Sequence, residues 1–355
     1  MTLEDLGYNS ELEEYRQDQN LGLFGIGRVI QEHKDRYKVN TESCELDCEL
    51  IGNLRFAATN RNELPAVGDW VAISEYDEGK ALIHDVLPRY SVLERQAVGK
   101  FGEKQIIACN IDYGLIVQSI NRDFNINRLE RYLTLCYASK IEPIIVVSKT
   151  DLIDEENLND LLNKITSRVK NVPIVPVSNE TQAGMDDLKK LIHKGKTYCL
   201  LGSSGVGKSS LINSLSGESR MKTGAISDSI DRGKHITTHR ELIPLVNGAI
   251  LIDNPGMREV GITDISGGLE STFEKIYALS NHCKFSDCTH TSEKGCAVKS
   301  AIENGEIDKS SFENFLKMER EKEHYESTVV EKRKKDKDFG KMIKHYKKTR
   351  KSNKY

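Results

Sequence analysis

The sequence lacks any apolar run that approaches the ~20 residues needed to cross a bilayer. Its first thirty residues carry several acidic side chains and have no apolar core of the signal-peptide type. It also contains no evident internal repeat. With these features missing, we expect a cytoplasmic protein without membrane contact. The length of 355 residues predicts two or three domains, because one hydrophobic core rarely serves so long a chain.

The net charge of −3 conceals an uneven distribution of charge. Residues 332–355 contain twelve Lys and Arg residues against two Asp residues, so this tail carries +10 and the rest of the chain carries −13. A solvated tail is one interpretation, and a segment that lies along phosphates is the other, because each neutralised phosphate releases a counterion. An acidic body with a basic arm fits a large RNA better than a small substrate.

The eight cysteines are unevenly placed, and clustered thiols in a chain without a secretory signal indicate metal binding before disulfides. Cys44 and Cys48 alternate with acidic residues, together with Leu46 and Leu50. A period of two is typical of a strand with one buried face. We therefore predict that both of these cysteines point into a core.

Changes of pattern divide the chain into a polar leader at 1–20 and three domains. Residues 21–95 contain short alternating runs separated by turn residues, which predict a small antiparallel barrel or sandwich. Residues 96–265 contain continuous apolar runs such as "PIIVVS" and "YCLLG" with helical stretches between several of them, which predict a mostly parallel α/β sheet in three layers. Residues 266–355 are predicted to be helical and charged around a Cys/His cluster, with the basic tail at the end.

A phosphate-binding loop lies at residues 202–209, which match G-x-x-x-x-G-K-[ST] completely between an apolar strand and a helical run. The glycines allow backbone N–H groups to point at phosphate oxygens, and the helix N-terminus adds a partial positive charge. Lys208 would bridge the β- and γ-phosphates during catalysis, and the Ser209 hydroxyl would bind Mg²⁺. The residues expected around the phosphates are Gly202, Ser203, Ser204, Gly205, Val206, Gly207, Lys208, Ser209 and Ser210.

A D-x-x-G motif follows the P-loop, with Asp253 at the end of an apolar run and Gly256 three residues later. This spacing lets a carboxylate hold the Mg²⁺ shell while a glycine N–H meets the γ-phosphate. Between the two motifs, "RGKHITTH" offers Thr237 or Thr238 as the switch hydroxyl that senses the γ-phosphate and the metal. We prefer Thr237 as a ligand and catalytic residue, and Thr238 stays open.

The segments that could select the base precede the P-loop instead of following it. Guanine presents N1–H and N2–H₂ donors that one carboxylate can accept together, and "SKTD" supplies Asp151 for this task, with the Lys149 stem against the ring. A second strand end, "PVSNE", offers Ser178 and Asn179 to guanine O6. Ligands of open α/β sheets bind at such strand ends. The motif order is that of a GTPase domain cut and rejoined, which leaves its strands adjacent in one sheet.

A second candidate site is a C-x4-C-x-H-x5-C cluster formed by Cys283, Cys288, His290 and Cys296. Three thiolates and one imidazole suit tetrahedral Zn²⁺, and four protein ligands leave no open position. We therefore predict one structural zinc ion. His282 is an alternative fourth ligand, although its adjacency to Cys283 would strain simultaneous chelation.

The order of a small β-domain, a permuted GTPase domain and a Cys3His module resembles the family of ribosome small-subunit-dependent GTPases called RsgA. The resemblance runs from about Gly27 to Phe315 and includes "LPAVGDWV", "DFNINRLERYL", "GSSGVGKSSLIN", "RGKHITTHREL", "DNPGMREVG" and "CKFSDCTHTSEKGCAV". It implies an OB-fold at the front, binding of GTP, GDP and Mg²⁺, and GTP hydrolysis stimulated by the small (30S) ribosomal subunit, with its 16S rRNA, during late maturation. We expect a monomer when the protein is free. The motif spacing by itself indicates only a GTPase with an RNA partner.

Two positions depart from the usual GTPase pattern. Ser148 replaces the Asn of N-K-x-D that would reach guanine N7, so we expect guanine selectivity to persist through Asp151 with weaker affinity. Met257 occupies the place of the Gln that orients the attacking water in Ras-like proteins, which a thioether cannot do. The resemblance points to His235 as the replacement, acting on water when the ribosome orders the switch loop. The alternative for His235 is a basic loop residue that touches RNA.

Two other classes of function stay open at this point. A P-loop ATPase or small-molecule kinase would need neither Asp151 nor the zinc cluster. A non-hydrolysing RNA-binding scaffold would use nucleotide only for stability.

Overall fold

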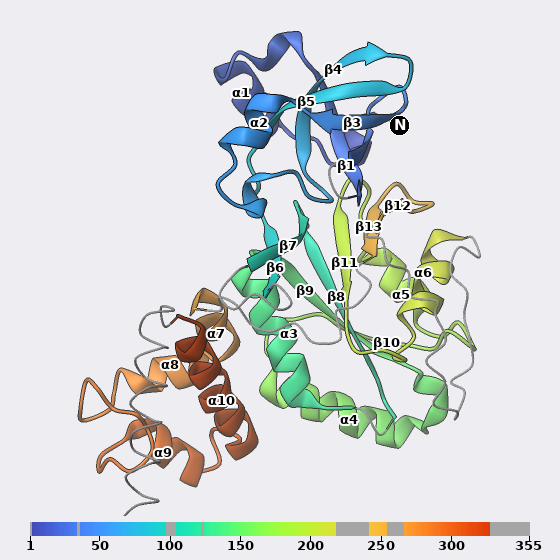
Figure 1. Ribbon diagram of the computed structural model, residues 1–355. Coiled ribbons are helices and arrows are strands. Elements are labelled where there is room, and N and C mark those ends of the chain that lie inside the picture. The colour runs from blue at the N-terminus through green and yellow to red at the C-terminus, as the bar shows by residue number, and fades with distance from the viewer. Residues whose placement is uncertain are drawn as a thin grey trace, which may run out of the picture.

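A computed structural model describes residues 2–33, 36–96, 104–121, 124–217, 241–253 and 266–326. These residues form a barrel, a central sheet flanked by helices, and a helical module that carries the Cys3His cluster (Figure 1). Among them, no helix is both long enough and apolar enough to cross a membrane.

The N-terminal domain is a closed five-stranded barrel with the strand order β1-β2-β3-β5-β4, in which β4 returns to pair with β1. Its elements are β1 (Gly25–His33), β2 (Arg36–Asn40), β3 (Glu45–Leu50), α2 (Gly52–Ala57), β4 (Trp70–Asp77) and β5 (Lys80–Val86). Alternate residues of the strands, such as Val39, Leu46 and Ile83, are buried inside. This closed barrel confirms the expected OB-fold. It excludes the sandwich, the other arrangement that the alternating pattern allowed.

The leader folds into short helices that pack on the barrel. They are η1 (Glu4–Leu6) and α1 (Ser10–Asp18), and η2 (Leu21–Leu23) follows them directly. Another short helix, η3 (Arg61–Glu63), comes after the barrel's α2. The Asn9 side chain caps α1 by accepting a hydrogen bond from the Leu12 N–H at 3.0 Å. Leu6 and Leu12 are buried against Trp70, so the leader completes the barrel's apolar packing.

The prediction for the two barrel cysteines is right for one and wrong for the other. Cys48 lies in β3 and is buried, whereas Cys44 is exposed and precedes the strand. Pairing of β2 with β3 begins at Asn40 and Glu45. The Thr41 N–H and hydroxyl both donate to the Cys44 carbonyl, at 2.9 and 2.8 Å, so Cys44 belongs to the tight turn between the strands.

The central sheet has the order β10-β9-β8-β11-β13-β12, and all neighbours are parallel except β12 and β13. Its strands are β8 (Tyr113–Ser119), β9 (Glu142–Ser148), β10 (Ile174–Val177), β11 (Thr197–Leu201), β12 (Glu241–Pro244) and β13 (Ile250–Asp253). A separate hairpin of β6 (Val92–Gln96) and β7 (Lys104–Cys109) precedes it. The predicted alternation of buried parallel strands and helices is therefore confirmed.

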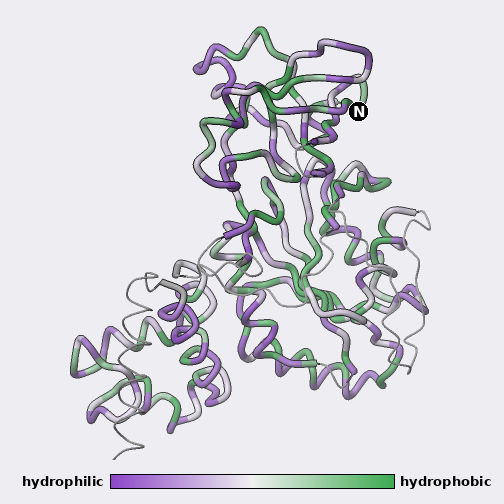
Figure 2. Tube along the Cα trace, viewed as in Figure 1, coloured by the Kyte–Doolittle hydropathy of each residue, from purple (hydrophilic) through white to green (hydrophobic). Residues whose placement is uncertain are grey.

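Helices cover both faces of this sheet because successive strand residues point to opposite sides. Ile116 and Ile145 pack with one set of helices, and Leu115 and Ile144 pack with the other. The first set is α3 (Ile126–Ala138) and α4 (Glu155–Arg168), and the second is α5 (Met185–Lys190) and α6 (Lys208–Ser216). The strands between them are predominantly hydrophobic (Figure 2).

The barrel joins the central sheet through β1, which pairs with β12 at Gln31 and Glu241. Next to this contact, the buried Arg28 side chain reaches across the joint. Its guanidinium donates to the Asn110 carbonyl and to the Thr197 hydroxyl, each at 2.9 Å, and lies 5.6 Å from the centre of the Trp70 ring. Because these hydrogen bonds satisfy a buried charge, they hold the barrel in one orientation on the sheet.

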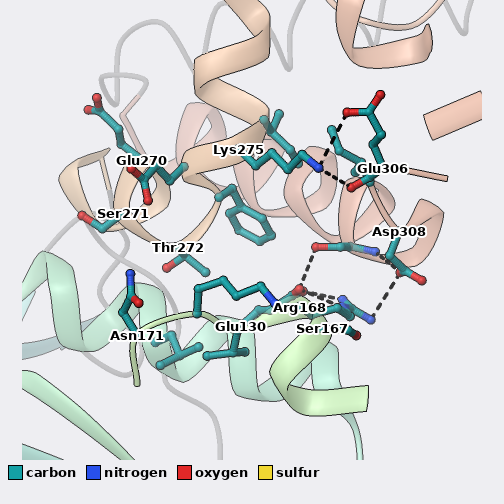
Figure 3. Close-up of a pocket in the computed structure, with 18 of the residues that line it drawn as sticks. Glu130, Ser167, Arg168, Asn171, Glu270, Ser271, Thr272, Lys275, Glu306 and Asp308 are labelled. Carbon is teal, nitrogen blue, oxygen red and sulfur yellow. Dashed lines mark hydrogen bonds and ion pairs between the residues drawn. The ribbon is translucent and has the colours of Figure 1, made fainter. Parts of the chain in front are cut away.

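The C-terminal module contains α7 (Ser266–Thr272), α8 (Glu274–Ser280), α9 (Ala297–Glu303) and α10 (Lys309–Glu326) around its own apolar cluster. It docks on α3 and the end of α4 beside a cavity of about 940 Å³ (Figure 3). The buried Glu130 carboxylate accepts from Arg168 at 2.7 Å and from Asn314 at 2.7 Å, which joins the module to the sheet domain. Lys275 pairs with Glu306 on the far side of the cavity. The cavity is lined by residues of α3, of the segment at the end of α4 and of the module, so it lies at the joint between two folded units.

Candidate nucleotide site and candidate metal centre

The P-loop connects β11 to α6 at the carboxyl edge of the sheet. Gly202 has φ +146°, and a Cβ there would lie 2.3 Å from the Val117 carbonyl oxygen, so only glycine fits. Ser204 and Gly205 form the exposed tip, and Val206 is buried beneath it. Ser209 and Ser210 lie half-buried in the first turn of α6, where free backbone N–H groups attract anions.

The P-loop lysine folds back over its own loop. The Lys208 Nζ donates to the Gly202 carbonyl at 2.7 Å and also to the Ser203 carbonyl. The ammonium group is thus held at the mouth of the loop by two backbone oxygens. This position places a positive charge beside the N-terminus of α6, as phosphate binding requires.

The two predicted base segments meet each other next to the P-loop. Asp151 lies in η4 (Thr150–Leu152), directly after β9, and its Oδ1 accepts a hydrogen bond from the Ser178 hydroxyl at 2.5 Å. The Thr181 N–H in turn donates to the Ser178 hydroxyl at 3.1 Å. The carboxylate is therefore held in one orientation by the loop after β10. Lys149 has φ +63°, a left-handed turn that redirects the chain at the end of β9.

Ser148, the departure from the usual asparagine, contacts the protein and is 1% exposed. Its hydroxyl donates to the Val206 carbonyl at 2.6 Å, so the end of β9 is tied directly to the P-loop. The contact of Ser148 with guanine stays a prediction, and the hydrogen bond to Val206 adds a structural role that the sequence did not indicate.

Asn179, in the loop after β10, lies next to the P-loop as well. A Cβ added to Gly207 would lie 3.1 Å from the Asn179 Nδ2, so the loop after β10 also touches the P-loop. The Asn179 Oδ1 is buried and has no hydrogen-bond partner within the described part of the chain. Burial of an acceptor without a hydrogen bond costs free energy, and a donor group of a ligand bound nearby would remove this cost.

Asp253 is the last residue of β13, next to β11, and its side chain is half-buried at the same edge of the sheet. The remaining predicted site residues lie outside the described residues. They are His235, Thr237, the alternative Thr238, and Gly256, together with Met257.

Two contacts to the P-loop were not foreseen from the sequence. Arg128 in α3 donates from Nη1 to the Ser203 hydroxyl at 2.9 Å. Tyr132, one turn later, also interacts with Ser203; burial raises the pKa of this tyrosine and the contact with Ser203 opposes the rise. The i, i+4 spacing places both side chains on one helix face, but no motif indicates that this face meets the P-loop.

The four predicted metal ligands gather in one place. The ligand atoms of Cys283, Cys288, His290 and Cys296 all lie within 4.8 Å of one another. The two thiol sulfurs of Cys283 and Cys296 are 3.8 Å apart, and the His290 Nδ1 lies 3.6 and 3.4 Å from them. His282, the alternative ligand, is exposed and its Nδ1 lies 3.0 Å from the Ala278 carbonyl oxygen instead.

These separations match the edges of a zinc tetrahedron. Bonds of about 2.3 Å to sulfur and about 2.0–2.1 Å to nitrogen give edges of about 3.8 Å between sulfurs and about 3.6 Å between sulfur and nitrogen. The Lys299 N–H donates to the Cys296 sulfur at 3.4 Å, a contact that stabilises a thiolate. The donor set is compatible with zinc.

Comparison with known proteins agrees with this geometry. The family model described as RsgA GTPase matches residues 86–263. A second model, described as ABC transporter, matches residues 185–348, a range that includes the P-loop but not Asp151. Both contain the P-loop, which is common to many nucleotide-binding proteins.

Whole-chain relatives decide between the two models. A Listeria monocytogenes protein named small ribosomal subunit biogenesis GTPase RsgA 2 is 44% identical over 90% of this chain and 89% of its own length. A Methanosarcina acetivorans protein named small ribosomal subunit biogenesis GTPase RsgA is 39% identical over 88% of this chain and 83% of its own length.

Two solved structures share the fold. The crystal structure of YjeQ from Thermotoga maritima has a TM-score of 0.63 and 29% identity, and covers 84% of this chain and 98% of its own. YloQ, described as a circularly permuted GTPase, has a TM-score of 0.63 and 27% identity, over 86% of this chain and 97% of its own. Since the relatives span nearly the whole chain and the strands follow the permuted order, this protein is a GTPase that belongs to the RsgA GTPase family.

Proposed function

We propose that this chain binds the small (30S) ribosomal subunit through its 16S rRNA and hydrolyses GTP there during late maturation of the subunit. The observation that supports the proposal is the hydrogen bond from Ser148 to Val206, which ties the strand end before Asp151 to the loop that carries Lys208. We propose that the Asp151 carboxylate accepts from guanine and that Lys208 binds the phosphates. The partner is supported by the names of the curated relatives and by the +10 tail. The protein would act in the cytoplasm and be monomeric when free.

In this proposal, the Asp151 carboxylate accepts the N1–H and N2–H₂ donors of guanine, and Ser178 keeps it oriented. Ser178 and Asn179 are the proposed contacts of guanine O6, and the Lys149 stem is proposed to cover the ring. Lys208 and the N–H groups of Gly202–Ser210 hold the phosphates. Ser209, Thr237 and Asp253 are the proposed Mg²⁺ ligands, and Mg²⁺ bound there would neutralise charge on the phosphate oxygens.

Hydrolysis at this site depends mainly on positioning and on stabilised charge. Lys208 supplies a positive charge that the loop holds in place before substrate binds. His235 is proposed to orient the attacking water, with Thr237 beside the γ-phosphate, once the subunit orders that segment. Slow turnover of the isolated protein follows from this arrangement.

The Cys3His cluster is proposed to hold one structural Zn²⁺ with no open position. Such a site stabilises the fold of the module that contains it. Phe312, Phe315 and Met318 of α10 belong to the same apolar cluster as Cys296, with Cys283 and Cys288 packed against it.

The function is tested by GTP turnover in the presence of isolated small or large ribosomal subunits. Small subunits should raise turnover at least about tenfold, because they order the catalytic segment, and large subunits should not. No stimulation by small subunits would support a nucleotide-dependent scaffold instead. Excess ATP should leave turnover of labelled GTP unchanged; effective competition by ATP would support an ATPase.

Substitution of the guanine-accepting carboxylate should change base selection. Asp151→Asn removes an acceptor of two donors, and hydrogen bonds to charged groups contribute about 1.5–3 kcal/mol each, so GTP affinity should fall about 100-fold or more. Affinity for xanthosine triphosphate should rise, because its C2 carbonyl can accept from the new amide. Nucleotide titrations measure both changes. Asp154→Asn, at the exposed cap of α4, is the matched control and should change neither affinity.

Metal analysis tests the zinc proposal. The purified protein should contain about one zinc per chain, and Cys288→Ser should reduce this content at least about fivefold because one of four ligands is lost. Cys44→Ser, at an exposed thiol outside the cluster, should keep the metal. A Cys288→Ser protein with full zinc content would contradict the assignment. GDP affinity should be unchanged in both variants.

A further inference from the structure

Hydrogen bonds at the start of α3 hold the backbone of Arg128 in place beside the P-loop. The Asn125 side chain caps α3 by accepting from the Arg128 N–H at 3.3 Å. The Gln118 side chain in β8 bonds both the N–H and the carbonyl of Asn125, at 3.2 and 3.1 Å. The start of α3 is therefore anchored to the sheet. The Arg128 side chain, which donates to the Ser203 hydroxyl at 2.9 Å, extends from this anchored turn.

Ser203 connects this arginine to the phosphate-binding lysine. Its hydroxyl accepts from Arg128, while its carbonyl accepts from Lys208 together with the Gly202 carbonyl. Position 203 is unrestricted in the P-loop pattern, so the motif does not account for this contact. A shift of the Ser203 backbone would move one of the two oxygens that orient the Lys208 ammonium.

An adjoining side of α3 contacts the C-terminal module. Arg131 pairs with Glu321 of α10 at 2.7 Å, and the Thr134 hydroxyl lies 2.9 Å from that of Thr272 in α7. Arg128 and Arg131 thus stand three residues apart on one helix, one facing the P-loop and the other facing the module. This pair provides a matched comparison, since both substitutions remove an arginine from the same helix.

We propose that Arg128 is a positioning residue for GTP hydrolysis, which acts by fixing Ser203 and so the backbone oxygens that orient the Lys208 ammonium. Negative charge shifts between phosphate groups as the γ-phosphoryl group leaves, and a preorganised cation stabilises that state more than the ground state. Loss of Arg128 should therefore slow turnover more than it weakens binding. The inference goes beyond GTPase activity itself and is independent of the proposed ribosomal partner.

The test measures GTP turnover without ribosomal subunits, and GDP affinity with a fluorescent GDP. Arg128→Ala should lower kcat about tenfold, equivalent to about 1.4 kcal/mol, while the Kd for GDP stays within about twofold. Ser203→Ala should give at least as large a loss, because it removes the Tyr132 contact as well, and the double variant should be no slower than Ser203→Ala, because the Arg128 contact is lost in both. Arg131→Ala should keep the wild-type kcat. Thermal melting checks that each variant is folded, and Ser203→Ala carries the test if Arg128→Ala is not.

Three results would overturn the inference. The first is a wild-type kcat in folded Arg128→Ala, or in Ser203→Ala. The second is a strictly additive double variant, which would mean that Arg128 acts through a group other than Ser203. The third is a loss of GDP affinity equal to the loss of kcat, which would mean that Arg128 stabilises the P-loop for nucleotide binding in general and has no particular role in hydrolysis. Because no subunit is present, none of these results bears on the proposed partner.

Discussion

The hydrogen bond from the Ser148 hydroxyl to the Val206 carbonyl joins two segments that are 58 residues apart in the chain. It ties the end of β9, which presents Asp151, to the loop that presents Lys208. In the proposed site, Asp151 binds the base and Lys208 binds the phosphates, so this contact helps to set a distance that must match the fixed length of a nucleotide. A buried serine hydroxyl makes this tie at the position where GTPases usually have asparagine.

The permuted order of motifs is compatible with this geometry because the sheet depends on neighbouring strands, not on the sequence in which the chain visits them. β9, β8 and β11 lie side by side and parallel, so their carboxyl ends meet at one edge. The barrel then attaches beyond β12 and the C-terminal module attaches to α3. Both added units thus contact elements that lead directly into the nucleotide site.

Much of this arrangement could be predicted from local pattern. Continuous apolar runs identified the strands of the sheet, and the spacing of glycines, lysine and serine identified the P-loop. The cluster of Cys283, Cys288, His290 and Cys296 was predictable because its ligands are close in sequence, and His282 was rightly the weaker choice. In each case the information lies within a few residues.

The features that sequence reasoning missed depend on contacts between distant segments. The partner of Ser148 is set by which strands are neighbours, and the contact of Arg128 with Ser203 spans 75 residues. Cys44 was misjudged for a different reason, since the alternation continued into a turn where no strand partner exists. Periodicity describes which face a residue occupies, but the end of pairing decides whether that face is buried.

The most direct test of the account is a crystal structure of the protein with bound GDP. The account predicts that one nucleotide spans the junction, with the Asp151 carboxylate within hydrogen-bond distance of guanine N1 and N2 and the Lys208 ammonium beside the β-phosphate. A nucleotide whose phosphates occupy the P-loop while its base points away from Asp151 would contradict the account.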